Sequence, residues 1–300
     1  MRYVLVWVLF LLSGACGLIY EVLWTRHLGL IFGNTAESLS AVLTAFMAGL
    51  ALGSFVAGRL CHRIRRPLMV YGVLELLIGL YCAILPLLFG LDSPLIPYYG
   101  KLYGESGGSD LPTMRFLISF GLLLVPTTFM GATLPLLSHY LVRSKTMLGR
   151  TVGTLYAINS FGAVVGALAT GFVLLPALGK ISTNNVAVVC NIVLGIIAIA
   201  YGMRSPLPDA AAESATPPPK KPGQKDEVLP PVPKAPISPL AVKLAVLSFG
   251  ITGFAAMVTQ IGWTRAISLG TGSSTYAFSL IVGVFILGLS MGGSWAARVA

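Results

Sequence analysis

Apolar runs long enough to cross a lipid bilayer recur along the whole chain, and they constrain the fold more than any other feature. A helix of about 20 residues crosses the hydrocarbon layer. We predict eight such spans, at residues 3–24, 38–60, 67–90, 113–142, 150–178, 183–203, 240–268 and 274–298. The runs are longer than barrel strands and lack strand-like alternation, so the predicted fold class is an all-α integral membrane protein.

The composition excludes a soluble domain of this size. Of the 300 residues, 56% are hydrophobic and only 10% are charged, which is too few charges to keep a soluble surface polar. The cysteines Cys16, Cys61, Cys82 and Cys190 have no paired spacing, so we expect neither a disulfide framework nor a metal site. No catalytic residue and no cofactor are expected within this chain.

The net charge of +10 indicates membrane topology rather than nucleic-acid binding. Most basic residues lie at the start of the chain or follow an even-numbered span, and few lie on the other side. By the positive-inside rule, the N-terminus and the linker at 204–239 are cytoplasmic. We therefore predict a multi-pass protein of the cell membrane, with the lipid bilayer as its main partner and no nucleic-acid partner.

The sequence contains an internal repeat. With a shift of 239 positions, residues 13–59 align without a gap on residues 252–298, and about a quarter of the positions are identical. Six spans separate the two starts, so both copies have the same orientation in the membrane. Two parallel six-helix halves are typical of major facilitator transporters.

This repeat predicts the domain organisation. Residues 1–203 form one complete six-helix half, and residues 240–300 supply only the first two helices of the second half. We therefore expect the chain to be a fragment or a truncated product. The segment 204–239 is rich in proline and lysine, and its composition is typical of an extended, disordered tether.

Two glutamates within spans are the leading candidates for substrate binding. An ionisable group at membrane depth is costly, so Glu21 and Glu75 should face the bundle interior and have partners. Two carboxylates at different depths could anchor the ammonium groups of a polyamine. For Glu21 a local ion pair with Arg26 or Arg115 is the preferred interpretation, so Glu75 is the stronger candidate.

Two asparagines within spans, Asn159 and Asn191, are further binding candidates. An asparagine in a membrane helix more often makes an interhelical hydrogen bond than it binds a substrate. Both interpretations stay open from the sequence.

The motif Trp-Thr-Arg occurs in both copies of the repeat, as Trp24 with Arg26 and as Trp263 with Arg265. Gln260 replaces Glu21 in the second copy, so the motif does not require the acid. We interpret it as an interfacial end of a span, with tryptophan at headgroup level and arginine reaching to the polar surface.

Glycines at small-residue spacing indicate close helix contacts. They occur in the second, fifth and eighth spans, as Gly49 with Gly53, Gly162 with Gly166, and Gly288 with Gly292. Such spacing lets helix backbones approach closely, either in static packing or in sliding during alternating access. Pro126 and Pro135 are expected to bend the fourth span.

Two resemblances to known families follow from these motifs. The segment GRLCHRIRRP, residues 58–67, resembles the cytoplasmic loop between the second and third helices of the major facilitator superfamily, which implies a gating role for Arg63 and Arg66. His62 stands where that family usually has aspartate, so the carboxylate that would pair with the arginines is missing.

The second resemblance is more specific. The run Tyr20 to Arg26, together with PTTFMGATLPLL at 126–137 and NSFGAVVGALATGFVLLPALG at 159–179, is similar to the membrane part of the bacterial fused major-facilitator/spermidine-synthase proteins. The resemblance implies a bacterial inner-membrane protein and an aminopropyltransferase domain. Residues 1–300 contain no soluble stretch with the glycine-rich turn of such a domain.

Two functions are therefore considered. The first is a facilitator-like membrane protein that binds or transports a polyamine or related organic cation. The alternative is a membrane anchor or scaffold for a spermidine-synthase-like aminopropyltransferase domain that lies beyond residue 300 or on another chain. A truncated product without activity also stays open.

Overall fold

The structure, a computed structural model, describes residues 2–32, 36–89, 111–142, 148–204, 238–272 and 275–299. These residues are almost entirely helical and contain no strand, which confirms the all-α class. The linker interior, at 205–237, lies outside the described residues. The tether predicted for this segment therefore stays a prediction.

The helices follow the predicted spans closely. They are α1 (Arg2–Phe32), α2 (Ala36–Leu60), α3 (Pro67–Phe89), α5 (Leu111–Leu141), α6 (Leu148–Ala169), α7 (Leu175–Arg204), α9 (Pro239–Thr271) and α10 (Thr275–Val299). A short 3-10 helix η1 (Cys61–Arg63) follows α2, and a π-helical turn η3 (Thr170–Leu174) joins α6 to α7. Long apolar segments adopt helices because a helix satisfies its own backbone polar groups.

Among the described residues, seven helical stretches are long and apolar enough to cross a membrane, which is compatible with a multi-pass protein. One of them, Gly149–Arg204, has 56 residues and corresponds to two predicted spans. It is interrupted at Gly179, whose φ of 75° and ψ of −180° are not helical. Glycine adopts this positive φ without the steric cost of a Cβ atom. The break lies where the sequence predicts the fifth span to end.

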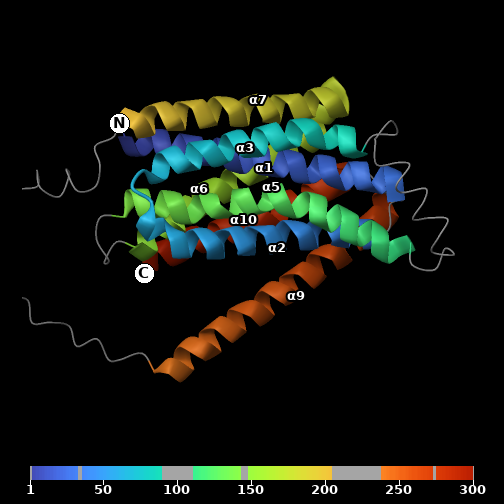
Figure 1. The fold of residues 1–300 in the computed structure, drawn as a ribbon. Coiled ribbons are helices and arrows are strands. Elements are labelled where there is room, and N and C mark those ends of the chain that lie inside the picture. Colours follow the sequence, from blue (N-terminus) through green and yellow to red (C-terminus); the bar gives the residue numbers. More distant parts are fainter. Residues whose placement is uncertain are drawn as a thin grey trace, which may run out of the picture.

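Most helices lie side by side in one bundle, and α9 diverges from it (Figure 1). Within the bundle α1 packs on α6, α2 on α5, and α3 on α7, and α10 packs on the other side of α6. Large side chains from α1, α2, α3 and α5, including Tyr20, Leu43, Ile78 and Leu123, are fully or almost fully buried in the main core. Most side chains of α9 are exposed.

Three prolines inside helices each leave a carbonyl without its usual backbone donor, because proline has no N–H for the residue four positions earlier. In α5, Pro126 frees the carbonyl of Leu122, and the Tyr81 hydroxyl donates to that oxygen at 2.8 Å. Further along α5, Pro135 frees Gly131, and the Ser54 hydroxyl donates to its carbonyl oxygen at 2.8 Å.

The third proline follows the same rule. In α3, Pro86 frees the carbonyl of Cys82, which accepts from the side-chain amide of Asn184 at 3.0 Å. In each case a side chain from a neighbouring helix supplies the missing donor. Proline is tolerated in membrane helices because side-chain donors of this kind replace the missing backbone N–H.

The repeat found in the sequence is also present in the helix boundaries. Adding 239 to the bounds of α1 and α2 gives 241–271 and 275–299, and the observed helices are α9 (Pro239–Thr271) and α10 (Thr275–Val299). The environments of the copies differ. More than half of the most apolar stretch of α1 is buried, and none of the corresponding stretch of α9 is.

Two predictions about the repeat are wrong in this structure. The first span does not end at residue 24, since α1 continues to Phe32. Trp24 is therefore not at a helix end. It is 3% exposed and stacks on Tyr20, with ring centroids 5.8 Å apart. Residues 27–32 remain apolar, so the helix has no local reason to stop at the motif.

The close contact predicted for Gly288 and Gly292 is also absent. A Cβ atom at either position would meet no described atom within 4 Å. These residues lie on a face of α10 that has no neighbouring helix among the described residues, because α10 packs on α6 through a different face. There Gly283 lies against Leu168, and Gly293 lies against Tyr156.

Candidate functional site

A buried polar cluster surrounds Glu75 on α3. The carboxylate is fully buried and accepts two short hydrogen bonds, from the Ser13 hydroxyl at 2.6 Å and from the Asn191 side-chain amide at 2.6 Å. Tyr20 extends the cluster, since its hydroxyl donates to the Asn191 side-chain oxygen at 3.4 Å. The cluster therefore connects α1, α3 and α7 at one level of the bundle.

Glu75 has a further polar neighbour one helical turn earlier. The Tyr71 hydroxyl lies beside the carboxylate and donates to the Leu9 carbonyl oxygen at 3.3 Å. Tyr71 is fully buried as well. Of the predicted binding residues, the structure brings Glu75 and Asn191 together.

Glycine contacts between α3 and α7 set the position of this cluster. A Cβ atom on Gly72 would lie 2.7 Å from the Gly195 carbonyl oxygen, and the reciprocal distance is also 2.7 Å. On the same pair of helices, a Cβ atom on Gly79 would lie 3.2 Å from the Cβ atom of Asn191. The two backbones can approach this closely only because these positions lack side chains. The approach brings the Asn191 amide within reach of Glu75.

Glu21 lies apart from this cluster. Its side chain is only 3% exposed. The ion pair expected with Arg26 is not formed among the described side chains, because Arg26 instead donates to the Thr275 hydroxyl on α10 at 2.5 Å. The side chain of Arg115, the other expected partner, lies outside the described residues.

Asn159 makes an interhelical hydrogen bond. Its side-chain amide donates to the carbonyl oxygen of Phe10 at 3.0 Å, and its backbone lies close to Gly14 on α1. This contact belongs to the packing of α6 on α1. In the same interface Gly162 and Gly166 lie against the backbone of Leu11 and Ala15.

The residues of the loop motif lie at the end of the bundle that is rich in arginine. Arg66 donates to the carbonyl oxygen of Met203 at 3.2 Å and so ties the start of α3 to the end of α7. Arg63 is exposed.

Gly49 and Gly53, on α2, lie against Thr127 and Thr128 of α5. Trp263 of the second copy is 60% exposed, unlike Trp24.

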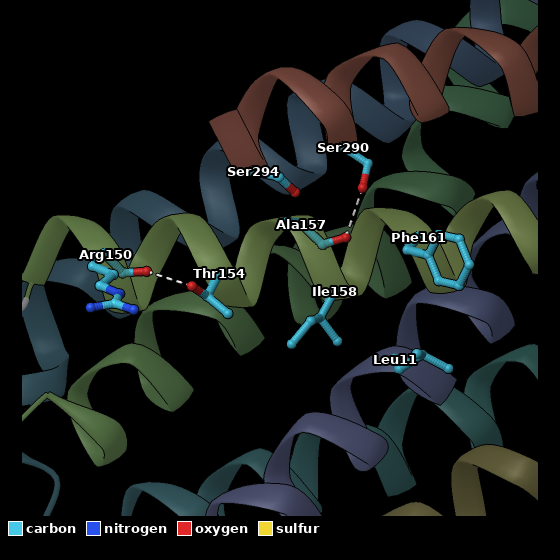
Figure 2. A pocket seen from close by; sticks show the side chains of 8 residues that line it. All are labelled: Leu11, Arg150, Thr154, Ala157, Ile158, Phe161, Ser290 and Ser294. Carbon is cyan, nitrogen blue, oxygen red and sulfur yellow. Dashed lines mark hydrogen bonds between the residues drawn. The ribbon is translucent and has the colours of Figure 1, made fainter. Parts of the chain in front are cut away.

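A cavity of about 420 Å³ lies between α1, α6 and α10 (Figure 2). Its polar lining consists of Arg150, Thr154, Ser290 and Ser294. Two of the hydroxyls are already used, since Ser290 donates to the Ala157 carbonyl oxygen at 3.0 Å and Thr154 to that of Arg150 at 2.8 Å. None of the predicted binding residues lines this cavity.

The geometry limits what these sites can do chemically. Each oxygen of the Glu75 carboxylate accepts a hydrogen bond from a protein side chain, and Glu75 does not line the cavity between α1, α6 and α10. The cavity carries a guanidinium group, which repels a polyammonium ion. Sequence reasoning missed Ser13, Tyr20 and Tyr71, because hydroxyl side chains are common in membrane helices and only the packing shows which of them meet Glu75.

Comparison with known proteins adds a second kind of observation. The chain resembles bacterial polyamine aminopropyltransferases. It is 29% identical to polyamine aminopropyltransferase 1 of Streptomyces coelicolor over 204 residues, which cover 68% of this chain and 35% of that protein. It is 33% identical to polyamine aminopropyltransferase 2 of the same organism over 193 residues, 61% of this chain and 32% of that protein.

The polyamine aminopropyltransferase of Mycobacterium tuberculosis is 27% identical over 190 residues, which cover 62% of this chain and 33% of that protein. The chain thus spans about a third of the length of the curated relatives it matches. No family model matches the chain, and no solved structure does. The similarity to proteins of this name agrees with the resemblance seen in the sequence.

Proposed function

We propose that residues 1–300 form a facilitator-like membrane module that serves polyamine aminopropyl transfer, and that the module holds a polyamine aminopropyltransferase domain at the bacterial inner membrane. That domain would lie on the same polypeptide beyond residue 300 or on a partner chain. Residues 1–203 are the complete half of the module, and residues 240–300 begin the second half. The N-terminus and the linker at 204–239 face the cytoplasm.

The observation that carries this proposal is the content of the matched region. The matches to proteins named polyamine aminopropyltransferase extend over 186 to 204 residues. The longest stretch between described helices is the linker between α7 and α9, which is far shorter than the matched region. The matched region therefore consists largely of apolar helices. Apolar helices of this length can anchor a protein in the bilayer. The similarity to polyamine aminopropyltransferases links these helices to polyamine chemistry.

The state of Glu75 favours a supporting role over a binding role. A buried carboxylate that receives donors from Ser13 and Asn191 fastens α3 to α1 and α7. A polyamine could reach it only by displacing these donors and by opening the glycine contacts between α3 and α7. Removal of a partner from a buried charged group is expensive, so the cluster stabilises one arrangement of the helices.

Fractionation of cells tests the anchoring function. Aminopropyl transfer to putrescine is measured in membrane and soluble fractions of the source cells, before and after in-frame deletion of the codons for residues 1–300. We expect activity in the membrane fraction that moves to the soluble fraction after the deletion. Activity that is soluble in both strains would contradict the proposal. Reporter fusions within residues 205–237 test the orientation, and we expect them to be cytoplasmic.

A second candidate function is transport of a polyamine or related organic cation, and the repeat favours it. After a shift of 239 positions the bounds of α1–α2 match those of α9–α10 except that α9 begins two residues earlier, and such a repeat is typical of transporters built from parallel repeats. Uptake of labelled spermidine into proteoliposomes that contain the full-length parent protein tests this candidate. Saturable uptake that Glu75→Gln abolishes, while Ser13→Ala retains it, would favour transport. No uptake would leave anchoring as the function.

A further inference from the structure

Three metal-ligating side chains meet at the arginine-rich end of the bundle, away from the Glu75 cluster. Cys61 and His62 lie on the 3-10 helix η1 just after α2, and His139 lies near the end of α5. Each can offer one ligand atom, and these atoms all lie within 4.8 Å of one another. We propose that Cys61, His62 and His139 bind a divalent transition-metal ion, with Zn²⁺ as the reference occupant.

The packing of α2 on α5 brings these residues together. A Cβ atom on Gly53 would lie 1.9 Å from the Thr128 carbonyl oxygen, and one on Gly131 would lie 2.3 Å from the Leu50 carbonyl oxygen. The two helices therefore run in contact, and their ends coincide. The imidazole rings of His62 and His139 lie edge to face, with centroids 6.1 Å apart.

The distances suit a tetrahedral ion. Around Zn²⁺, with bonds of about 2.3 Å to sulfur and about 2.0 Å to nitrogen, neighbouring ligand atoms lie roughly 3.6 Å apart. The Cys61 sulfur and the His62 Nδ1 atom are 3.7 Å apart. The longer separation within the cluster, up to 4.8 Å, closes by a side-chain rotation of His139, which is exposed.

The ligand set determines which ion is favoured. A thiolate and two imidazoles suit zinc and copper, whereas Mg²⁺ and Ca²⁺ prefer oxygen ligands. Cys61 is 7% exposed, and its thiol donates to the Gly58 carbonyl oxygen at 3.3 Å. On metal binding the thiol loses its proton to the solvent, and the sulfur becomes a ligand. Three protein ligands leave a fourth position for water.

Nearby positive charge opposes a cation, but only weakly. Arg59, Arg63 and Arg65 are exposed, so salt and water screen them. The guanidinium of Arg59 is held over the Phe55 ring, 3.8 Å from its centroid. A bound ion would tie the connection between α2 and α3 to the end of α5, and so restrict movement at this end of the bundle.

Cobalt titration of the full chain tests the site. The protein is purified in detergent without a polyhistidine tag, reduced, and titrated with Co²⁺. We expect one ion per chain, visible bands typical of tetrahedral cobalt and a near-ultraviolet thiolate-to-cobalt band, all displaced by Zn²⁺ and unaffected by excess Mg²⁺. Cys61→Ser should abolish the thiolate band, and His139→Ala should weaken binding at least tenfold.

Matched controls separate the site from adventitious binding. His27→Gln and Cys190→Ser change the remaining histidine and a cysteine outside the cluster, and both should retain the full titration. Zn²⁺ should raise the melting temperature of the wild-type chain but not that of His139→Ala, whose exposed side chain is not needed for folding. Absent bands in the wild type, bands that survive Cys61→Ser, or bands that Mg²⁺ displaces would each overturn the proposal.

Discussion

The side-chain amide of Asn184, on α7, donates at 3.0 Å to the carbonyl oxygen of Cys82, which Pro86 deprives of its backbone donor in α3. The same relationship joins Tyr81 to Leu122 and Ser54 to Gly131. Each proline is thus compensated by a hydroxyl or amide group of another helix. Each of these hydrogen bonds both satisfies a carbonyl oxygen that a proline leaves free and joins two helices.

The Asn184 contact can be tested by a double-mutant cycle. Asn184→Ala leaves the Cys82 carbonyl unsatisfied, and we expect it to lower the free energy of unfolding by about 1–2 kcal/mol. Pro86→Ala restores the backbone donor, so Asn184→Ala should cost less in that background. Unfolding in mixed micelles, followed by circular dichroism, gives the four values. Equal costs in both backgrounds would show that the amide does not compensate the proline.

Tyr81→Phe tests the corresponding contact in α5. The substitution removes only the hydroxyl that donates to the Leu122 carbonyl oxygen, and we expect a loss of about 1 kcal/mol in the free energy of unfolding. The matched control is Tyr156→Phe, at a side chain that is 39% exposed. Thermal unfolding of both variants should show the loss for Tyr81→Phe alone. Similar melting temperatures for both variants would contradict the assignment.

Gly72→Ala tests the contact that positions the Glu75 cluster. The added methyl group would lie 2.7 Å from the Gly195 carbonyl oxygen, so α3 and α7 must move apart. We expect a loss of about 1–3 kcal/mol in unfolding free energy. Gly250→Ala, in a helix where a Cβ atom meets nothing within 4 Å, should instead be neutral or stabilising because alanine favours helix. Destabilisation by Gly250→Ala alone would refute this account.

Gly179→Ala tests the break between the fifth and sixth predicted spans. Its φ of 75° with ψ of −180° is a conformation adopted essentially only by glycine, and we expect alanine to cost about 1–3 kcal/mol in unfolding free energy. Space is not the cause, because a Cβ atom there would meet nothing within 4 Å. Gly121→Ala has equal space without the positive φ, and should be neutral or stabilising. Equal stability of the two variants would argue against a left-handed residue at this break.

The positions of the helices could be predicted from the sequence, but their rotations could not. Apolar length predicts the third span at 67–90, and α3 is Pro67–Phe89. Hydropathy does not say which face of an apolar helix meets another helix. For that reason the motif predicts a helix end at Trp24, whereas α1 continues to Phe32 and Trp24 is buried against Tyr20. The same limit led to Gly288 being assigned a packing contact.

The candidate sites show this limit as well. Glu75 could be singled out because a carboxylate in an apolar span needs partners. Its partner Ser13 lies 62 residues away in the sequence, and no sequence motif at Ser13 predicts a contact with Glu75. Cys61 and His139 are similarly distant in sequence, and they meet only because α2 and α5 end at the same level.

The closely matching bounds of the helix pairs α1–α2 and α9–α10 have a consequence for shortened forms of the chain. Since residues 13–59 align on residues 252–298 without a gap, joining any position of the first copy to its counterpart in the second would remove 239 residues and keep one pair of helices. The shortened chain would lack α5 and α6, on which α2 and α1 pack in the full chain, so the remaining pair of helices would lose its main packing partners.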